Sequence, residues 1–330
     1  MITDSEMLYL YVETPLHVGN GGSVGVIDLP IQRDAHTDYP IIPGSALKGK
    51  LRAEIGAQLE KTYKAANEPN PKEKAEGFIS IVFGAENNKG DYAGAIAPCD
   101  AKLLLFPVRS LNGVFAYTTS MHALAEYNRT LIAAGKTALP ASSPSAQTAY
   151  ITDGSAVYYA PSIVLEEYSF TRDTNTTIQP QIDTLAEALA ATLPSGAEYD
   201  FFRAKVKDSL MILPNDDFRD FAKYSTEVVT RIRIDQTTKT VADGALWTEE
   251  LVCPDTLFYA PLHATPPRTN VLPAGMAPTG EAVLEVITNS GLQRIQLGGD
   301  ETVGRGMICL QFGANPIVTN QPGGEVNAAN

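Results

Sequence analysis

Three carboxylates are the residues of this chain whose surroundings best suit chemistry. Asp28 stands between Ile27 and Leu29, directly after a glycine-rich segment. An acid among apolar neighbours is expected to have a raised pKa, which suits proton transfer, and capping of a turn is the alternative. Glu249 and Glu250 follow the only tryptophan, near the end of a predicted strand. They are either solvated or placed to approach a phosphate together with a metal ion.

The histidines give a weaker signal. His17 precedes the glycine-rich segment and could act as a general base or a phosphate donor, or be structural. His36, His122 and His263 show neither HxH nor HExxH spacing, so we expect no zinc site. The three cysteines show no nucleophilic setting.

Residues 14–52 combine a flexible backbone, one acid and a basic helix. A glycine-rich loop over 18–25 leads to Asp28, and Pro43-Gly44-Ser45 then opens a predicted helix with Ser45 as its cap. A helix N-terminus favours anions through its free N–H groups and its dipole. The helix residues expected to hold a polyanion are Ser45, Lys48, Lys50 and Arg52. A solvated surface helix is the alternative.

A second glycine-rich loop, GGDETVGRG at 298–306, resembles a phosphate cradle. Glycines let backbone N–H groups approach an anion, and an arginine can pair with it. The residues assigned to this role are Gly298, Gly299, Thr302, Gly304, Arg305 and Gly306. The loop matches neither GxxxxGK[ST] nor a dinucleotide fingerprint, because a strand follows it. A tight hairpin is the alternative that the spacing leaves open.

Periodicity and turn residues predict an α+β fold. Strands are expected over 6–13, 101–108, 114–119, 226–234, 245–253, 256–262, 292–297 and 307–312. Helices are expected over 45–67, 121–134, 183–192, 197–212, 216–224 and 280–289, and loops over 67–76 and 135–161. This order favours a ferredoxin-like, RNA-recognition-type sheet with large insertions and a projecting β-hairpin.

Charge and cysteine content restrict the function classes. A net charge of −13 over 330 residues weighs against a free-standing nucleic-acid binder and favours an acidic enzyme or an assembly subunit. Positive charge can still act locally, because screening extends over only about 8 Å. Three isolated cysteines indicate a reducing compartment. Without a basic signal region or an apolar run of about 18 residues, we expect a cytoplasmic protein with no membrane partner.

Four segments, in this order along the chain, resemble the RAMP superfamily. They are TPLHVGNGGSVGVIDLPIQRDAHTDYPIIPGSALKGKLR (14–52), DAKLLLFPVRSLNGVFAYTTS (100–120), RIRIDQTTKTVADGALWTEE (231–250) and QLGGDETVGRG (296–306). The resemblance is closer to the backbone nuclease subunit of the type III-B CRISPR (Cmr) effector complex, which targets RNA. Any one glycine loop would be a weak signal, whereas the ordered combination is specific.

The resemblance implies a single hand-like module over 1–312, followed by a flexible tail at 313–330. A ferredoxin-like palm would comprise 6–135 and 279–312, with a helical insertion at about 180–225 and a thumb hairpin at about 226–262. Copies of the chain would stack helically along a guide CRISPR RNA, together with other Cmr subunits. Each thumb would displace a base of the guide–target duplex at regular intervals.

The resemblance also implies that single-stranded target RNA is cut beside each displaced base, with Mg²⁺ or Mn²⁺ required. The essential aspartate of the family maps onto Asp28, which would also hold the metal. A family histidine maps onto His17, and an acidic pair maps onto Glu249 and Glu250. Relatives often have an aromatic residue after that pair, whereas this chain has Leu251, which puts a role for that aromatic in doubt.

Two other functions remain open from the sequence. One is a structural backbone subunit that holds guide and target RNA without cutting. The other is a stand-alone endoribonuclease that processes guide precursors, for which a histidine-centred mechanism is expected. The acid in the opening loop favours the target nuclease over the processing enzyme. In that function, Lys48 and the 298–306 loop would hold guide phosphates independently of sequence.

Overall fold

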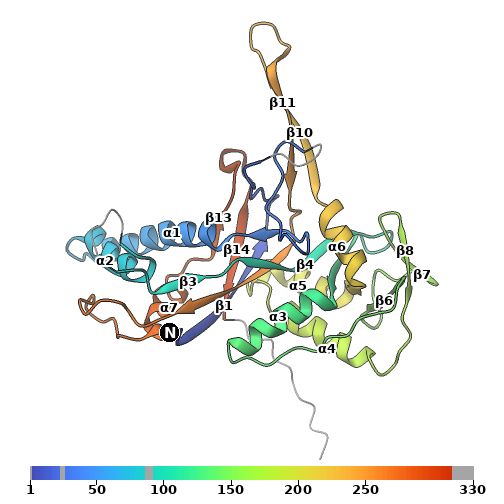
Figure 1. The fold of residues 1–330 in the computed structure, drawn as a ribbon, viewed down its shortest axis with the longest axis horizontal. Coiled ribbons are helices and arrows are strands. Elements are labelled where there is room, and N and C mark those ends of the chain that lie inside the picture. The colour runs from blue at the N-terminus through green and yellow to red at the C-terminus, as the bar shows by residue number, and fades with distance from the viewer. Residues whose placement is uncertain (1, 23–26, 86–91, 314–330) are drawn as a thin grey trace, which may run out of the picture.

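A computed structural model describes residues 2–22, 27–85 and 92–313 (Figure 1). Residues 23–25 of the predicted glycine-rich loop and 314–330 of the predicted tail lie outside the described residues. Among the described residues, no helix combines the length and the apolar composition needed to cross a bilayer.

The chain forms a large sheet, helices on both of its faces and a separate hairpin. The strands of the sheet are β1 (Asp4–Val12), β2 (Ile41–Ile42), β3 (Ile96–Pro98), β4 (Ala101–Arg109), β5 (Phe115–Ser120), β6 (Thr148–Ile151), β7 (Ser162–Leu165), β8 (Tyr168–Arg172), β9 (Leu210–Leu213), β12 (Leu257–Ala264), β13 (Arg294–Gln296) and β14 (Met307–Phe312). The hairpin strands are β10 (Glu227–Ile234) and β11 (Val241–Leu251). The helices are α1 (Gly44–Ala65), α2 (Pro71–Phe83), α3 (Met121–Ala133), α4 (Gln179–Ala190), α5 (Asp200–Ser209), α6 (Asn215–Tyr224) and α7 (Gly280–Thr288), with 3₁₀ turns η1 (Ala197–Tyr199) and η2 (Glu301–Val303).

The centre of the sheet has the strand order β14-β1-β12-β4, with antiparallel neighbours throughout. Helix α1 lies between β1 and β4 in the chain, and α7 lies between β12 and β14. This is the βαββαβ arrangement of a ferredoxin-like sheet, so the predicted α+β fold is confirmed. The chain between β4 and β12 extends the sheet through β5, β9, β6, β8 and β7 and supplies α3 to α6 and the hairpin.

Strand β1 is buried on both faces. Leu8 and Leu10 belong to a core that also contains apolar residues of α1 and α7. Tyr9 and Tyr11 point to the opposite core, which contains residues of α3, α4 and α5. The Tyr11 hydroxyl donates a 2.6 Å hydrogen bond to Asp255, so its polar end is satisfied inside the protein. Layers on both faces hold the sheet as a rigid platform for the segments at its edge.

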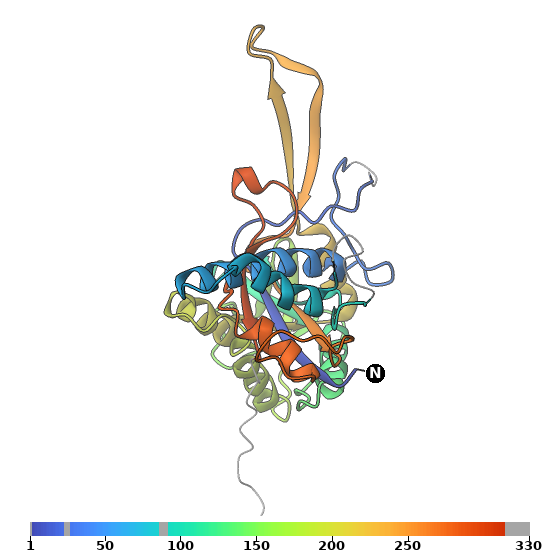
Figure 2. The ribbon, with the colours of Figure 1, turned by 90° about the vertical axis from the view of Figure 1, so that its left-hand side faces the viewer.

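The β10–β11 hairpin projects from one end of this platform, as Figure 2 shows. Val228, Ile232 and Leu246 of the hairpin are exposed, because none of the described segments forms a second layer over them. The predicted thumb range of 226–262 is too long. Strand β12 pairs with β1 and β4 at the centre of the sheet. Strand β12 is buried along almost its whole length, and its mostly apolar sequence is typical of a central strand rather than a projecting ribbon.

Several local predictions were wrong for identifiable reasons. The predicted loop at 67–76 instead contains the start of α2, which opens with Pro71 at a position where proline is well tolerated. The predicted helix at 197–212 stops at Ser209, and the next four residues form the buried strand β9. Ser45 is not the cap of α1; the cap is Pro43, and Asp100 accepts the Gly44 N–H at 2.7 Å.

Candidate active site at the base of the hairpin

Asp28 is exposed and lies beside the lower part of β11. The Leu29 N–H donates to the Thr248 carbonyl at 3.0 Å, and the Glu250 N–H donates to the Leu29 carbonyl at 3.0 Å. Asp28 Oδ2 accepts hydrogen bonds from the Thr248 backbone N–H at 2.8 Å and from its hydroxyl at 2.9 Å. The backbone bond and then the hydroxyl bond lower the pKa of Asp28, because both stabilise the charged carboxylate.

The expected raised pKa of Asp28 is therefore wrong. Its apolar sequence neighbours do not bury it, and the carboxylate is ionised at neutral pH. Within the described part of the chain, Oδ1 accepts no hydrogen bond from another residue. An ionised, solvent-facing carboxylate held at one oxygen can orient a hydroxyl or bind a cation with the other.

Glu249 is buried between arginines from two other segments, β10 and the 298–306 loop. Its Oε2 lies 3.1 Å from Arg305 Nη1 and 2.8 Å from Arg231 Nε, the latter without the alignment of a hydrogen bond. Asp300 forms ion pairs with the same two arginines. Arg231 Nη2 contacts Asp300 Oδ2, and Arg305 Nη1 lies 3.7 Å from the same oxygen. Burial is the largest cause of the raised pKa of Glu249, and the Asp300 carboxylate adds to it.

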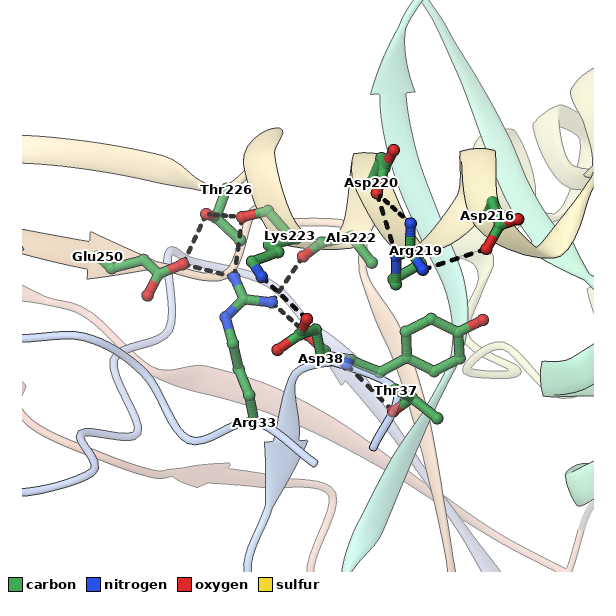
Figure 3. Close-up of polar contacts among 11 residues, drawn as sticks. Arg33, Thr37, Asp38, Asp216, Arg219, Asp220, Ala222, Lys223, Thr226 and Glu250 are labelled. Carbon is green, nitrogen blue, oxygen red and sulfur yellow. Dashed lines mark hydrogen bonds and ion pairs between the residues drawn. The ribbon is translucent and has the colours of Figure 1, made fainter. Parts of the chain in front are cut away.

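Glu250, the next residue of β11, points into a different group of contacts, which Figure 3 shows. Arg33 Nη2 donates to its carboxylate, and the Thr226 hydroxyl does so at 2.8 Å. The Ile31 N–H donates to the other carboxylate oxygen at 3.1 Å. Arg33 Nη1 also donates to the Ala222 carbonyl of α6 at 2.9 Å. Glu250 thereby fixes the loop that carries Asp28 to the hairpin and to α6.

His17 is buried, and its ring is fixed by the same strand. Its Nδ1 lies 2.8 Å from the Glu250 carbonyl, so this nitrogen carries the proton and donates. Nδ1 is also 4.0 Å from Glu249 Oε1. The structure thus brings His17, Glu249 and Glu250 together around β11, with Asp28 outside them on the exposed surface. The contacts of these three buried residues hold the chain segments around Asp28 in place.

The 298–306 loop packs directly on the segment that carries His17. The Gly299 N–H donates to the His17 carbonyl at 2.9 Å, and the Gly306 N–H donates to the Pro15 carbonyl at 3.0 Å. A Cβ on Gly298 would lie 2.0 Å from the His17 carbonyl oxygen, so only glycine fits there. Close packing of two chain segments therefore accounts for these glycines.

The predicted phosphate cradle is largely bonded within the chain. The N–H groups of Val303, Gly304 and Arg305 donate to carbonyls of the same loop, and the Arg305 side chain is paired with Glu249. Thr302 remains exposed at the tip of the turn. The loop therefore forms a tight turn, which was the alternative to a phosphate cradle.

The predicted RNA-binding residues of α1 lie elsewhere. Lys48 Nζ donates to the Ile96 carbonyl of β3 at 3.2 Å, and partial burial lowers its pKa. Lys50 pairs with Glu54 at 2.7 Å, and Arg52 donates to the carbonyl at the end of α2. Ser45 is exposed. Their contacts are with β3, α1 and α2, so the structure does not bring them to the loop around Asp28.

Four residues important to this geometry were not identified from the sequence. They are the partners of the acids, namely Arg33, Arg231, Thr248 and Asp300. Of these four, only Arg231 has a signal in the sequence. It lies near the middle of β10, and pairing of the hairpin brings it close to Glu249 of β11.

The fold and this site define a class of protein. A family model described as the RAMP superfamily matches residues 9–308, so the chain belongs to the RAMP superfamily and the resemblance seen in the sequence is confirmed. Within it, the CRISPR system Cmr endoribonuclease Cmr4 of Pyrococcus furiosus is 35% identical over 302 residues, which cover 91% of this chain and 92% of that protein. The CRISPR system CMR subunit Cmr4 of Saccharolobus solfataricus is 27% identical over 327 residues, covering 92% and 95% of the two chains.

Solved structures agree with these relationships. The crystal structure of oligomeric Cmr4 from Pyrococcus furiosus matches with a TM-score of 0.65 and 28% identity, covering 94% of this chain and 98% of that one. A chain in the cryo-EM structure of the Type III-B Cmr-beta bound to cognate target RNA matches with a TM-score of 0.67. At 23% identity, with 96% and 99% of the chains covered, the latter likeness concerns the fold alone.

Substitution of Gly298 by alanine is expected to displace the His17 segment. Gly304 is a matched control, because its φ of 78° equals the 77° of Gly298 within a degree but its Cβ would meet nothing within 4 Å. Gly304→Ala should cost about 1 kcal/mol from its left-handed backbone alone, and Gly298→Ala about 1–3 kcal/mol more from the clash. Urea unfolding of both variants measures the difference, and equal losses would contradict the packing role.

Substitution of Arg33 by methionine is expected to destabilise the protein strongly. It leaves the buried Glu250 carboxylate without its cation, at a cost of about 3–5 kcal/mol in the free energy of unfolding. Arg219→Met is the control, because Arg219 pairs with Asp216 and Asp220 at the surface in the same region (Figure 3). That change should cost about 0–1 kcal/mol. Similar losses in urea unfolding of the two variants would show that the Glu250 contacts are not structurally important.

Proposed function

We propose that this chain is the CRISPR RNA-binding backbone subunit of a type III-B effector complex and cleaves complementary target RNA at regular intervals. The observation that carries the proposal is the exposed, ionised Asp28 at the foot of a projecting hairpin. The relative from Pyrococcus furiosus, which is named an endoribonuclease, supports the activity. The exposed apolar side chains of the hairpin suit insertion beside displaced bases.

Asp28 would act on the ribose 2′-hydroxyl that attacks the neighbouring phosphate. Displacement of a base splays the RNA backbone, which allows in-line attack, and Asp28 would orient the hydroxyl with its free oxygen. His17, Glu249 and Glu250 would keep the loop in place rather than contact the RNA, since all three are buried. Preorganisation of one carboxylate by a rigid base is the contribution of the chain itself.

We also propose that the reaction needs Mg²⁺ or Mn²⁺ bound at Asp28. One solvent-facing carboxylate fits such an ion, which often takes one or two protein carboxylates and completes its ligands with phosphate oxygens and water. The bound ion would stabilise negative charge that develops on the reacting oxygens. Glu249 and Glu250 are already paired with arginines and are poor candidates for further ligands.

The RNA and protein partners are part of the same proposal. Guide phosphates would contact Ser45, Lys48, Lys50 and Arg52 on α1, and the exposed Thr302 at the tip of the second glycine-rich loop, whose other predicted contacts are used within the chain. Further copies of the chain would stack along the guide, for which the oligomeric relative is support. Other Cmr subunits would complete a cytoplasmic complex. A non-catalytic backbone subunit, which holds guide and target without cutting, is the alternative.

Replacement of Asp28 is expected to stop cleavage without loss of assembly. In the reconstituted complex, Asp28→Ala and Asp28→Asn should reduce the rate of target cleavage about 10²–10⁴-fold, the range for a positioned acid–base group. Guide binding and target binding should not change. Asp235→Asn is the matched control, because Asp235 is also exposed and its pKa is lowered by hydrogen bonds from backbone N–H groups. Normal cutting by the Asp28 variants at the usual sites would exclude this assignment.

Removal of the metal distinguishes the proposed nuclease from a non-catalytic backbone subunit. We expect the wild-type complex to cut complementary RNA into regularly spaced products, to stop after chelation and to recover with added Mg²⁺ or Mn²⁺. Gel analysis of end-labelled target measures the products, and a filter-binding assay checks that target binding survives chelation. A wild-type complex that binds target and leaves it whole under all these conditions would support the structural backbone instead.

A further inference from the structure

A second cluster of ligand-type side chains lies outside the contacts of Asp28. His36 lies in the loop that follows Arg33, and His122 and Glu126 are one turn apart on α3. One nitrogen or oxygen atom from each of the three residues lies within 4.8 Å of the other two. The sequence spacing of the histidines predicted no zinc site, because it could not show that the loop brings His36 to α3.

His122 supplies the most informative observation. Its Nε2 is buried and has no hydrogen-bond partner among the described residues. A buried polar atom without a partner is uncommon and calls for a ligand or an ion. Glu126 Oε2 lies 4.0 Å from this nitrogen, which is too long for a hydrogen bond.

Glu126 divides its two oxygens between different neighbours. Oε1 accepts from Lys102 Nζ at 2.6 Å and from Arg129 Nη2 at 3.2 Å. Oε2 is the oxygen that faces His122. The cations therefore fix the carboxylate through one oxygen and keep the other directed at the histidine.

His36 is oriented in the manner of a metal ligand. Its Nδ1 lies 2.8 Å from Asp34 Oδ1, so Nδ1 donates its proton to a carboxylate and leaves Nε2 available. Histidines that bind metals commonly make this second contact, which fixes the tautomer and raises the basicity of the ligating nitrogen. The His36 and His122 rings form a T-shaped pair, with centroids 6.3 Å apart.

We propose that His36, His122 and Glu126 bind a divalent transition-metal ion, with Asp34 as the outer partner of His36. Two imidazoles and one carboxylate suit Zn²⁺, Co²⁺ or Ni²⁺ rather than Mg²⁺, which prefers oxygen ligands. Bonds of about 2.0–2.1 Å in a tetrahedral site place ligand atoms about 3.4 Å apart. The ligand atoms lie within 4.8 Å of one another, so they must come closer together to bind one ion. A small movement of His36 would achieve this, because its side chain is 67% exposed and can rotate.

The ion would join two elements that support the candidate active site. His36 lies three residues after Arg33, whose guanidinium binds Glu250 and α6. Tyr39, at the end of the same loop, packs edge-on against His122. A bound ion would therefore fasten this loop to α3 and hold Arg33 in place. It is a site separate from the magnesium or manganese ion proposed at Asp28.

Cobalt binding to the full chain, purified without a histidine tag, tests the proposal. Titration with Co²⁺ alone should give visible absorption bands that saturate at one equivalent, and Zn²⁺ should displace the ion. His36→Asn and His122→Gln should each raise the Kd at least tenfold, and Asp34→Asn about 10–100-fold as expected for an outer partner. His263→Gln is the control, because His263 is on β12 and bonds Ser5 instead.

The outcomes are distinct from those of the cleavage experiments, because binding is measured without RNA. Circular dichroism checks that each variant is folded, and His36→Asn keeps the test decisive if His122→Gln is unstable, since His36 is exposed. Stoichiometric Co²⁺ binding that survives in both histidine variants would overturn the proposal. So would the absence of a saturable site in the wild-type protein, or loss of binding only in Asp28→Ala.

Discussion

Two adjacent buried carboxylates on one strand are the constraint on which this site depends. Glu249 and Glu250 follow each other on β11, so their side chains leave opposite faces of the ribbon. An ionised carboxylate is costly to bury unless cations and hydrogen bonds surround it. Arg231 and Arg305 supply these on one face, and Arg33 supplies them on the other. Segments far apart in the chain are thereby drawn to the base of one hairpin.

The buried pair and the exposed acid have complementary properties. Glu249 and Glu250 are buried and paired with arginines, so their role is to hold the surrounding segments in place. Asp28 has few contacts of its own and takes its position from Thr248, which precedes the pair on the same strand. In the part of the chain that the structure describes, no layer covers the hairpin beyond this base, so the orientation of the hairpin also depends on the contacts at its foot. A rigid base and a solvent-facing carboxylate are what a site needs when its substrate is brought in by another molecule.

The sequence predicted those parts of the fold whose signals are local. Strand β1 and the helices capped by Ser120 and Thr279 were found because apolar alternation and capping chemistry act within a few residues. Strand β9 was missed, since its apolar residues continue directly from a helix and only its pairing with β5 and β6 distinguishes them. At the site, Asp28 was identified as a candidate, but its ionisation was predicted with the wrong sign. Its partner Thr248 is 220 residues away, and no local pattern predicts that contact.

The charge of the chain limits how it can hold RNA. A net charge of −13 gives no general attraction to a polyanion. The structure uses many of its cations internally, with Arg305 paired to Glu249 and Lys50 to Glu54. Such a chain, alone, would bind a phosphate backbone weakly. The proposed stack of copies along one guide would change this, because each added copy would bind a strand that is already held nearby, and weak contacts would then add through effective concentration. The acidic composition is therefore compatible with the proposed function only if the protein works as an assembly.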